Sequence, residues 1–467
     1  MVSNQQNIQH LLWRTGFGPS TDSNLKSNLE VEIDRIFIAS KKFTPLTLSS
    51  WHPVTQVELK KYTDAEKVAY RRMEKKARLE ILEQIFFRQQ NSESALREKM
   101  TLFWMGHFAC RVGNPAFMLK YYNTIGENAL GKFGELLKFM IHDPALLGYL
   151  NNNINRKARP NENFSRELME LFTIGIGNYS EKDVKEGARA FTGWTYDKTG
   201  EFLVKQEHHD NGLKTYHGET GNFDGNDIIR ILLARKECAT FITTKIYKYF
   251  VNHIPDKIRI TQLSTEFYNS EYDIEFLMKK IVSSEWFYNK ENIGVRVKTP
   301  LELIAGISKL FNIKFEDPLL RLPIQKVLGQ SLFDPPNVAG WPEGLGWIDS
   351  SSLMYRLRLP EVLLQDAETL MAPKEEFDAL ETMKFQSDPN LRGKKIKTVY
   401  DASSFNAKFR NKTSQDLMNS ISEFLLQKKP SPDKYKLIDS FTNDSIGDTR
   451  ILKTAIYFMS LPEYQLC

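Results

Sequence analysis

From Thr63 to Gln90 the chain reads TDAEKVAYRRMEKKARLEILEQIFFRQQ, and its fold class follows from this stretch. The stretch contains no glycine or proline and is rich in strong helix formers, so it predicts one long helix. Apolar residues with helical periodicity recur along the rest of the 467 residues, whereas strand signals are few. The sequence therefore predicts a mainly α, multi-helical globular protein.

A second helix is predicted to end near Phe108, and its apolar face carries Leu96, Met100, Phe103 and His107. This spacing indicates that His107 is buried. A lone histidine on an apolar helix face is most often a satisfied core residue. A carboxylate opposite its ring would instead indicate a functional role, because imidazole and carboxylate together transfer protons or hold metals.

The chain is predicted to divide into a main helical body, residues 1–365, and a C-terminal helical hairpin, residues 413–467. Residues 366–412 are polar and lysine-rich, which predicts an exposed connection between them. Within the main body, residues 193–227 combine several glycines with aromatic and β-branched residues. This composition predicts a small β-hairpin and long turns.

The overall composition excludes several classes of protein. The 63 basic and 58 acidic side chains give a net charge of only +5, spread along the chain, which argues against a nucleic-acid partner. The three cysteines, Cys110, Cys238 and Cys467, are far apart and form no CxxC pair, so no disulfide framework is expected. Phosphate-binding GxGxxG and GxxxxGK[ST] loops and the GxSxG elbow of serine hydrolases do not occur.

The sequence also gives expectations about location. No window holds the roughly 18 uninterrupted apolar residues of a transmembrane helix. The first residues, MVSNQQNIQHLLWRTGFG, contain no basic segment followed by an apolar one, so as written the chain is expected to be cytoplasmic.

The stretch NENFSRELMELFTIGIGNYSEKDVKEGARAFTGW, from Asn161 to Trp194, has an unusual density of charge, with six acidic and four basic side chains. On a helical wheel Phe164, Leu168 and Leu171 form an apolar stripe with Glu167 at its edge. A partly buried carboxylate must be paired, hydrogen-bonded or protonated. The stretch therefore predicts either a functional site or a structural network of ion pairs.

Three of the eight histidines lie in the loop EHHDNGLKTYHG. His209, Asp210, Lys214 and His217 could serve proton transfer or metal ligation, and loops of this kind often carry function. The alternative is a structural turn, in which Asp210 caps backbone amides and Lys214 is solvated.

A loop beginning at Phe333, FDPPNVAGWPEGLGWIDSS, combines two Pro steps with two tryptophans. The prolines fix the direction of the backbone, which would hold Trp341 and Trp347 in defined positions. The two indoles could form a platform for a ring-shaped ligand. Alternatively, they could simply fill the core beneath the loop.

Taken together, several motifs resemble the bacterial family known as domain of unknown function 1800. These are HLLWRTGFGPS at 10–20, REKMTLFWMGHFACR at 97–111, the charged stretch 161–194, HHDNGLKTY at 208–216, and FDPPNVAGWPEG with WIDSS. They occur in the order of that family and cover nearly the whole chain. The resemblance implies kinship but no reaction, because the family has no established activity.

The resemblance also shows two departures. Many relatives carry a histidine at the position of Met105 and another at the position of Phe172. If those histidines bind a metal, this chain lacks two of the ligands. Relatives are often exported and encoded beside a sulfatase-like protein, which implies a surface or polymer-derived substrate and a sulfatase-like partner.

Two functions remain open. In the first, the protein is a hydrolase-type enzyme that uses acid/base side chains, with or without a divalent metal. In the second, it is a non-catalytic partner or assembly factor for the neighbouring enzyme. The candidate catalytic residues of the first are Glu167, Glu170, His107, His209 and Asp210, and its candidate substrate-binding residues are Arg166, Glu162, Lys214, Trp341 and Trp347.

The enzyme hypothesis makes three structural predictions. The ring of His107 should lie within hydrogen-bonding reach of a carboxylate from the 162–170 helix. His209, Asp210 and Lys214 should converge on one cleft with Arg166 or Glu170. Glu167 should be partnered by a cation or by backbone donors.

Overall fold

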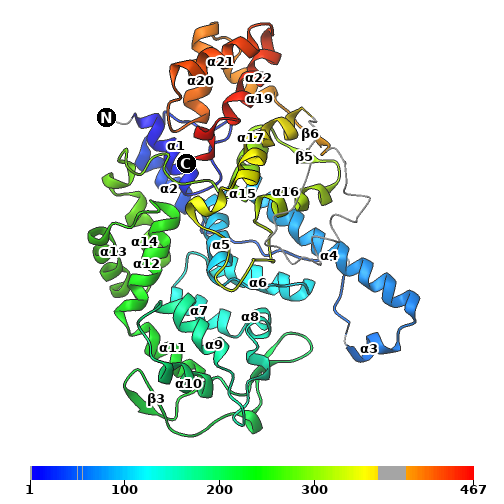
Figure 1. Ribbon diagram of the computed structural model, residues 1–467, viewed down its shortest axis with the longest axis vertical. Coiled ribbons are helices and arrows are strands. Elements are labelled where there is room, and N and C mark those ends of the chain that lie inside the picture. Colours follow the sequence, from blue (N-terminus) through cyan, green and yellow to red (C-terminus); the bar gives the residue numbers. More distant parts are fainter. Residues whose placement is uncertain (1–2, 50, 55, 366–395) are drawn as a thin grey trace.

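The computed structural model describes residues 3–49, 51–54, 56–365 and 396–467, and it is built almost entirely from helices (Figure 1). The mainly α fold class is thus confirmed. In the part of the chain so described, the sheets are three separate pairs of antiparallel strands. None of the described helices combines the length and the apolar character needed to cross a membrane.

The helices before residue 150 are α1 (Asn4–Arg14), α2 (Leu29–Ala39), α3 (Gln56–Lys61), α4 (Asp64–Asn91), α5 (Ala95–His107), α6 (Pro115–Asn128), α7 (Phe133–Ile141) and α8 (Pro144–Tyr149). The predicted long helix is α4. It begins with a capping box in which Thr63 and Glu66 exchange side-chain and backbone hydrogen bonds. The end of α4 that joins α3 extends away from the rest of the molecule (Figure 1).

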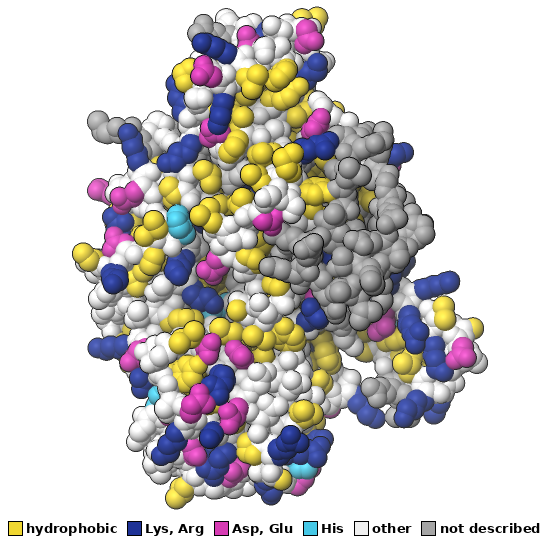
Figure 2. Space-filling view, in the orientation of Figure 1, with side chains coloured by type: hydrophobic (Ala, Val, Ile, Leu, Met, Phe, Trp, Pro, Cys, Tyr) yellow, Lys and Arg dark blue, Asp and Glu magenta, His cyan; other side chains and the backbone are white. Residues whose placement is uncertain are grey.

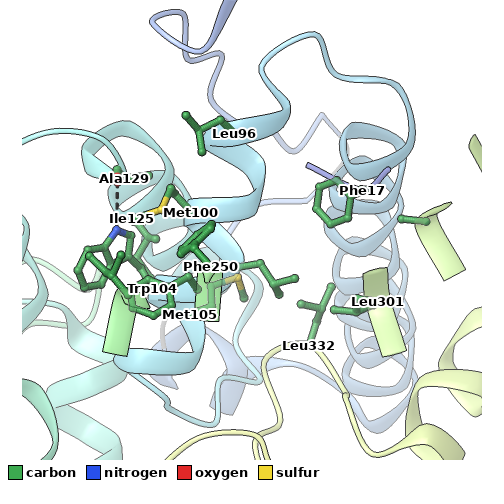
Figure 3. Close-up of a cluster of buried hydrophobic side chains, with 14 of the residues drawn as sticks. Phe17, Leu96, Met100, Trp104, Met105, Ile125, Ala129, Phe250, Leu301 and Leu332 are labelled. Carbon is green, nitrogen blue, oxygen red and sulfur yellow. Dashed lines mark hydrogen bonds between the residues drawn. The ribbon is translucent and has the colours of Figure 1, made fainter. Parts of the chain in front are cut away.

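Helix α5 lies in the centre of the core, because almost all of its side chains are buried and not only one face. Figure 3 shows Leu96, Met100 and Trp104 of this helix packed among apolar side chains from other elements. The indole of Trp104 donates a hydrogen bond to the carbonyl of Ala129 at 3.0 Å, so its polar atom is satisfied inside the core. The C-terminal end of α5, which carries His107, is therefore held rigidly.

The middle of the chain forms α9 (Glu162–Glu167), the π-helical turn η2 (Leu168–Thr173), α10 (Glu181–Ala190), α11 (Gly225–Leu233), α12 (Lys236–Phe250), α13 (Lys257–Asn269), α14 (Ile274–Val282), α15 (Pro300–Leu310), α16 (Arg321–Leu328) and α17 (Ser350–Leu364). Capping boxes occur at Ser180 with Asp183 and at Thr299 with Glu302. Each box satisfies backbone donors that the first turn of a helix leaves free.

The glycine-rich excursion contains two hairpins and not the single one that was expected. Strand β1 (Trp194–Tyr196) pairs with β2 (Phe202–Val204), and β3 (Lys214–Tyr216) pairs with β4 (Glu219–Gly221). The short 3₁₀ turns are η1 (Asn152–Ile154), η3 (Gln206–His208), η4 (Glu285–Tyr288), η5 (Pro318–Leu320), η6 (Gly344–Trp347) and η7 (Pro462–Gln465).

The C-terminal part holds α19 (Ser403–Phe409), α20 (Ser414–Leu425), α21 (Pro432–Thr442) and α22 (Gly447–Met459), which gather at one end of the molecule beside α1 (Figure 1). The expected hairpin is thus extended by a further helix, α21. The side-chain amide of Gln9 in α1 donates to the carbonyl of Phe424 in α20 at 2.7 Å. The two ends of the chain therefore pack together.

The expected exposed connection, residues 366–412, differs from the structure where the two can be compared. Residues 366–395 lie outside the described residues. The rest contains β6 (Thr398–Val399), which pairs with β5 (Lys314–Phe315), and α19. Phe405 and Phe409 of α19 are buried, because their rings pack on Phe424 of α20. This part is therefore packed and not a free linker.

Candidate functional site

The charged helix of residues 162–170 forms a structural ion network at the surface. Arg166 donates to Glu162 of the same helix at 3.3 Å and to Glu181 of α10 at 2.7 Å. The carboxylate of Glu170 accepts a hydrogen bond from the hydroxyl of Tyr179. The charges of Arg166 and Glu162 are thus paired within the protein, as expected for a structural network of ion pairs.

Glu167 differs from its prediction. It is half-buried, and no described residue donates a hydrogen bond to it or forms an ion pair with it. Burial, together with the nearby charge of Glu170, raises the pKa of its carboxyl. The expectation of a paired cation or backbone donor is therefore wrong for the described residues, and the nearby charge of Arg166 opposes only part of the rise in pKa.

His107 is buried as predicted, but its partner is not a carboxylate. Its Nε2 lies 3.1 Å from the carbonyl oxygen of Phe172, which only accepts, so Nε2 carries the proton. That carbonyl lies at the end of the π turn, where backbone acceptors lack a helical donor. Burial, with a contribution from the charge of Lys245, lowers the pKa of His107 well below its usual value.

The Nδ1 atom of His107 is buried and has no partner among the described residues. Since Nε2 carries the proton, Nδ1 presents a free lone pair. The ring of Phe172 has its centroid 5.9 Å from that of His107. An apolar ring therefore lies beside His107.

The histidine-rich loop is a structural turn. Asp210 accepts hydrogen bonds from the guanidinium of Arg189 at 2.7 Å, which lower the pKa of its carboxyl, and from the backbone of Gly212. Lys214 is buried and donates to the carbonyls of Asp210 and Gly212. The ring of His209 is also buried, and its Nδ1 lies 2.7 Å from the carbonyl of Thr192, which again requires a protonated nitrogen.

This loop therefore does not share a site with the charged helix. Neither Asp210 nor Lys214 contacts Arg166 or Glu170 among the described residues. Instead, both ion networks are anchored on α10, one through Glu181 at its start and the other through Arg189 near its end. The single-site prediction for these residues is wrong, because each charge is satisfied by a neighbour close to it in the fold.

An open cleft lies elsewhere, between the end of α5, helix α12 and the tryptophan loop. Its volume is about 270 Å³. We call it the tryptophan cleft, and its main lining residues are Phe103, His107, Lys245, Lys248, Tyr249, His253, Arg296, Trp341, Glu343 and Trp347. Three of the predicted site residues, His107, Trp341 and Trp347, are thus brought together.

The tryptophan loop is fixed against α5 by close packing. Gly340 has a φ of +95°, and a Cβ atom there would lie 2.4 Å from the carbonyl oxygen of Gly106. Its neighbour Trp341 packs over Gly106, and the indole donates to the carbonyl of Ser331 at 3.2 Å. Trp347 is almost fully buried, whereas Trp341 is half-buried. Both rings line the cleft while they also fill space beneath the loop.

The cleft has a basic side formed by α12. Lys245 is half-buried, and burial lowers the pKa of its ammonium to about 8, with Lys248 adding to the effect and Glu343 opposing it. Figure 2 shows basic and acidic side chains close together over the region between α12 and α5. An ammonium with a pKa near 8 exists in both protonation states close to neutral pH, which suits proton transfer.

The inner wall of the cleft is held by buried charges. Arg296 stacks its guanidinium over the ring of Tyr249 at 5.1 Å and donates to Glu302 at 2.6 Å. Glu302 also pairs with the buried ammonium of Lys99. The hydroxyl of Tyr249 and the Nε atom of Arg296 are buried and have no partner among the described residues. The hydrogen-bonding capacity of these two atoms is therefore not satisfied among the described residues.

Sequence reasoning missed Lys245 and Lys248, although a signal for them exists. They lie three residues apart on α12, whose opposite side carries the buried Ile242, Ile246 and Phe250. A helical wheel would have placed both ammonium groups on the exposed face, but not beside the tryptophan loop. As for metals, the described residues contain no group of three or more His, Cys, Asp or Glu side chains placed to hold an ion.

The relationship suggested by the motifs can now be tested over the whole chain. Residues 10–466 match the model of the family described as Protein of unknown function (DUF1800). The chain belongs to this family. The resemblance of the motifs is thereby confirmed, and the DUF1800 description assigns no reaction. The chain matches no curated protein and no solved structure.

Proposed function

We propose that this DUF1800 protein is a hydrolase-type enzyme whose active site is the tryptophan cleft. The observation that carries the proposal is the position of Lys245, whose pKa is lowered by burial to about 8, in an open cleft beside the carboxylate of Glu343. Concave sites with aromatic walls and a few convergent polar groups are typical of substrate binding. Perturbed titratable groups in such clefts are typical of acid/base catalysis.

In this proposal, Lys245 is the group that transfers the proton. With a pKa of about 8, roughly a tenth of its side chains are unprotonated at pH 7 and can accept a proton from a substrate hydroxyl or from water. Lys248 supplies positive charge to an anionic substrate group. The half-buried ring of Trp341 supports an apolar or sugar ring.

The proposal moves the catalytic role away from the residues that the sequence suggested. The charges of Arg166, Glu162, Asp210 and Lys214 are satisfied within their own networks, and buried His209 is bonded to a backbone carbonyl. Such networks perturb pKa values without catalysing a reaction.

Activity on a panel of p-nitrophenyl esters, phosphates, sulfates and glycosides tests the proposal. We expect release of nitrophenol from at least one class, with a limb of the pH–rate profile near pH 8. Lys245→Met should lower kcat by roughly 10²- to 10⁴-fold, the usual contribution of a general acid or base. Lys436→Met, which changes a largely exposed lysine on α21, is the matched control and should leave the rate unchanged.

No release from the whole panel, or full activity of Lys245→Met, would overturn the proposal. The remaining candidate is then a non-catalytic partner of a sulfatase-like enzyme. It is consistent with the ion pairs of Arg166 with Glu162 and Glu181, in which these charges are satisfied within the protein.

A further inference from the structure

A second hollow lies next to the tryptophan cleft, on the side of the π turn. Its volume is about 760 Å³, and it is lined by Glu170, Gly175 and Phe241 among others. Lys245 and Glu343 line both hollows, as does Lys248. The two hollows therefore adjoin at these side chains. We refer to them together as the groove, and the proposed catalytic lysine lies where they meet.

Helix α12 forms the floor of this groove. Lys236, Thr240, Thr244 and Lys248 are four residues apart in succession, so they follow one face of the helix. At 1.5 Å per residue this row is roughly 18 Å long. The groove is therefore longer than a single sugar or aromatic ring and suits a linear ligand.

The charges along the groove restrict the kind of ligand. Its lining contains Lys236, Lys245 and Lys248 together with the carboxylates of Glu170, Glu237 and Glu343. Three carboxylates would repel a chain that carries a phosphate on every unit, which disfavours a nucleic acid. The same groups suit a chain that carries occasional acidic groups and many hydroxyls.

The polar atoms and rings of the groove suit such a chain in detail. The hydroxyls of Thr240 and Thr244 lie along the floor. Trp341 in the tryptophan cleft and Phe241 in the second hollow, beside Lys245, are half-buried, so each offers part of an apolar ring to a sugar.

We propose that the ligand of this groove is an acidic oligosaccharide that spans both hollows. An acidic group lies between Lys245 and Lys248, one sugar ring contacts Trp341, and a later ring contacts Phe241. The inference rests on the proposed function, because both place the ligand in the tryptophan cleft. It concerns binding of the oligosaccharide, which can be measured whether or not the protein hydrolyses it.

Calorimetric titration with oligosaccharides of increasing length tests the inference. The probes are galacturonic acid and its oligomers up to the hexamer, chondroitin sulfate oligosaccharides, and neutral malto-oligosaccharides of equal length. We expect the acidic oligomers to bind about tenfold more tightly than the acidic monomer. The neutral series should bind weakly at every length, because Lys245 and Lys248 then have no anion to pair with.

Two variants probe the second hollow. Phe241→Ala removes a ring whose centroid lies 5.5 Å from the ammonium of Lys245, so it should weaken binding of the acidic monomer and of the tetramer alike, by roughly three- to tenfold. Thr240→Trp fills the groove from an exposed position on α12, so it should block long ligands even if Phe241→Ala impairs folding. Phe139→Ala, at a ring 51% exposed on α7, is the matched control.

The outcomes separate the inference from the proposed function. Equal affinity for monomer and oligomer, equal affinity for the neutral series, or no binding by either acidic series would overturn the inference. Length-dependent binding that Thr240→Trp abolishes would support it even if no substrate is hydrolysed. Hydrolysis that depends on Lys245 but not on ligand length would support the enzyme and refute the extended groove.

Discussion

Replacement of Glu302 by glutamine should destabilise the protein strongly, because this carboxylate compensates two buried cations. One of its oxygens accepts from Arg296 at 2.6 Å and also pairs with the ammonium of Lys99, and the other accepts from the backbone of Thr299 at 2.8 Å. The side chains of Glu302 and Lys99 are fully buried, and that of Arg296 is 5% exposed. Glu302→Gln keeps the shape of the side chain and removes only its charge.

The size of the effect can be worked out in two ways. Burial alone would raise the pKa of Glu302, but Arg296 and Lys99 lower it from 4.5 to about 2, a difference equivalent to about 3 kcal/mol. Breaking a buried ion pair by removing one partner generally costs about 3–5 kcal/mol, because the other charge stays buried. Both routes predict a loss of about 3 kcal/mol or more for Glu302→Gln.

Urea unfolding followed by circular dichroism at pH 7 measures this loss. Asp34→Asn is the matched control, since it breaks a pair with Lys279 in which both side chains are more than half exposed, and it should cost under about 1 kcal/mol. The effect of Glu302→Gln should also shrink with acid. Because the folded pKa is lowered, the stability gained from the charge is present above pH 4.5 and is lost as the pH falls towards 2.

A loss of less than about 1 kcal/mol for Glu302→Gln would refute this reasoning. It would mean that Lys99, whose pKa burial lowers to about 8, gives up its proton when its partner is removed. Lys99→Met distinguishes the two cases, because it leaves Glu302 paired with Arg296 and should therefore cost less than Glu302→Gln.

Because burial lowers the pKa of His107, the free energy of unfolding of the wild type relative to His107→Phe should fall by about 1.4 kcal/mol per pH unit below pH 6.5. Urea titrations of both proteins at pH 7 and pH 5 measure this difference. A difference that does not change with pH would contradict the burial of a neutral His107 ring. Glu167→Gln should change the free energy of unfolding by less than about 0.5 kcal/mol in thermal melts, because no described residue pairs with it. Gly340→Ala should cost about 1–3 kcal/mol and alter tryptophan fluorescence, because its Cβ would meet the carbonyl of Gly106; unchanged fluorescence would mean that the loop does not depend on this packing.

The helical fold could be predicted from the sequence because its signals are local. The capping boxes at Thr63, Ser180 and Thr299 each involve residues three positions apart, so the signal for each helix start lies within a few residues of sequence. Burial of His107 was also predicted, since the apolar face of a helix is visible in its own spacing. These features depend only on contacts between residues of the same helix, and the spacing of residues in the sequence is enough to predict such contacts.

The candidate site could be predicted only in part because its residues come from separate elements. His107 ends α5, Lys245 lies on α12, and Trp341 belongs to a loop after α16. The sequence showed that Trp341 and Trp347 would be held in place by the prolines around them, but not which helix they would face. That information depends on tertiary packing, here on the contact between Gly340 and Gly106.

Charge density was a misleading guide to function in this chain for a physical reason. Arg166 and Glu162 are four residues apart on one helix, a spacing at which opposite charges pair and stabilise the helix. Opposite charges that are close in sequence therefore readily form ion pairs with each other, so a high local density of charge does not by itself indicate a functional site. The carboxylate that raises the pKa of Lys245, that of Glu343, lies far away in the sequence, on the tryptophan loop, and burial still lowers this pKa overall. A charged group of that kind keeps the capacity to bind or to exchange a proton, and for this reason the function of the protein is better sought at Lys245 than on the charged helix.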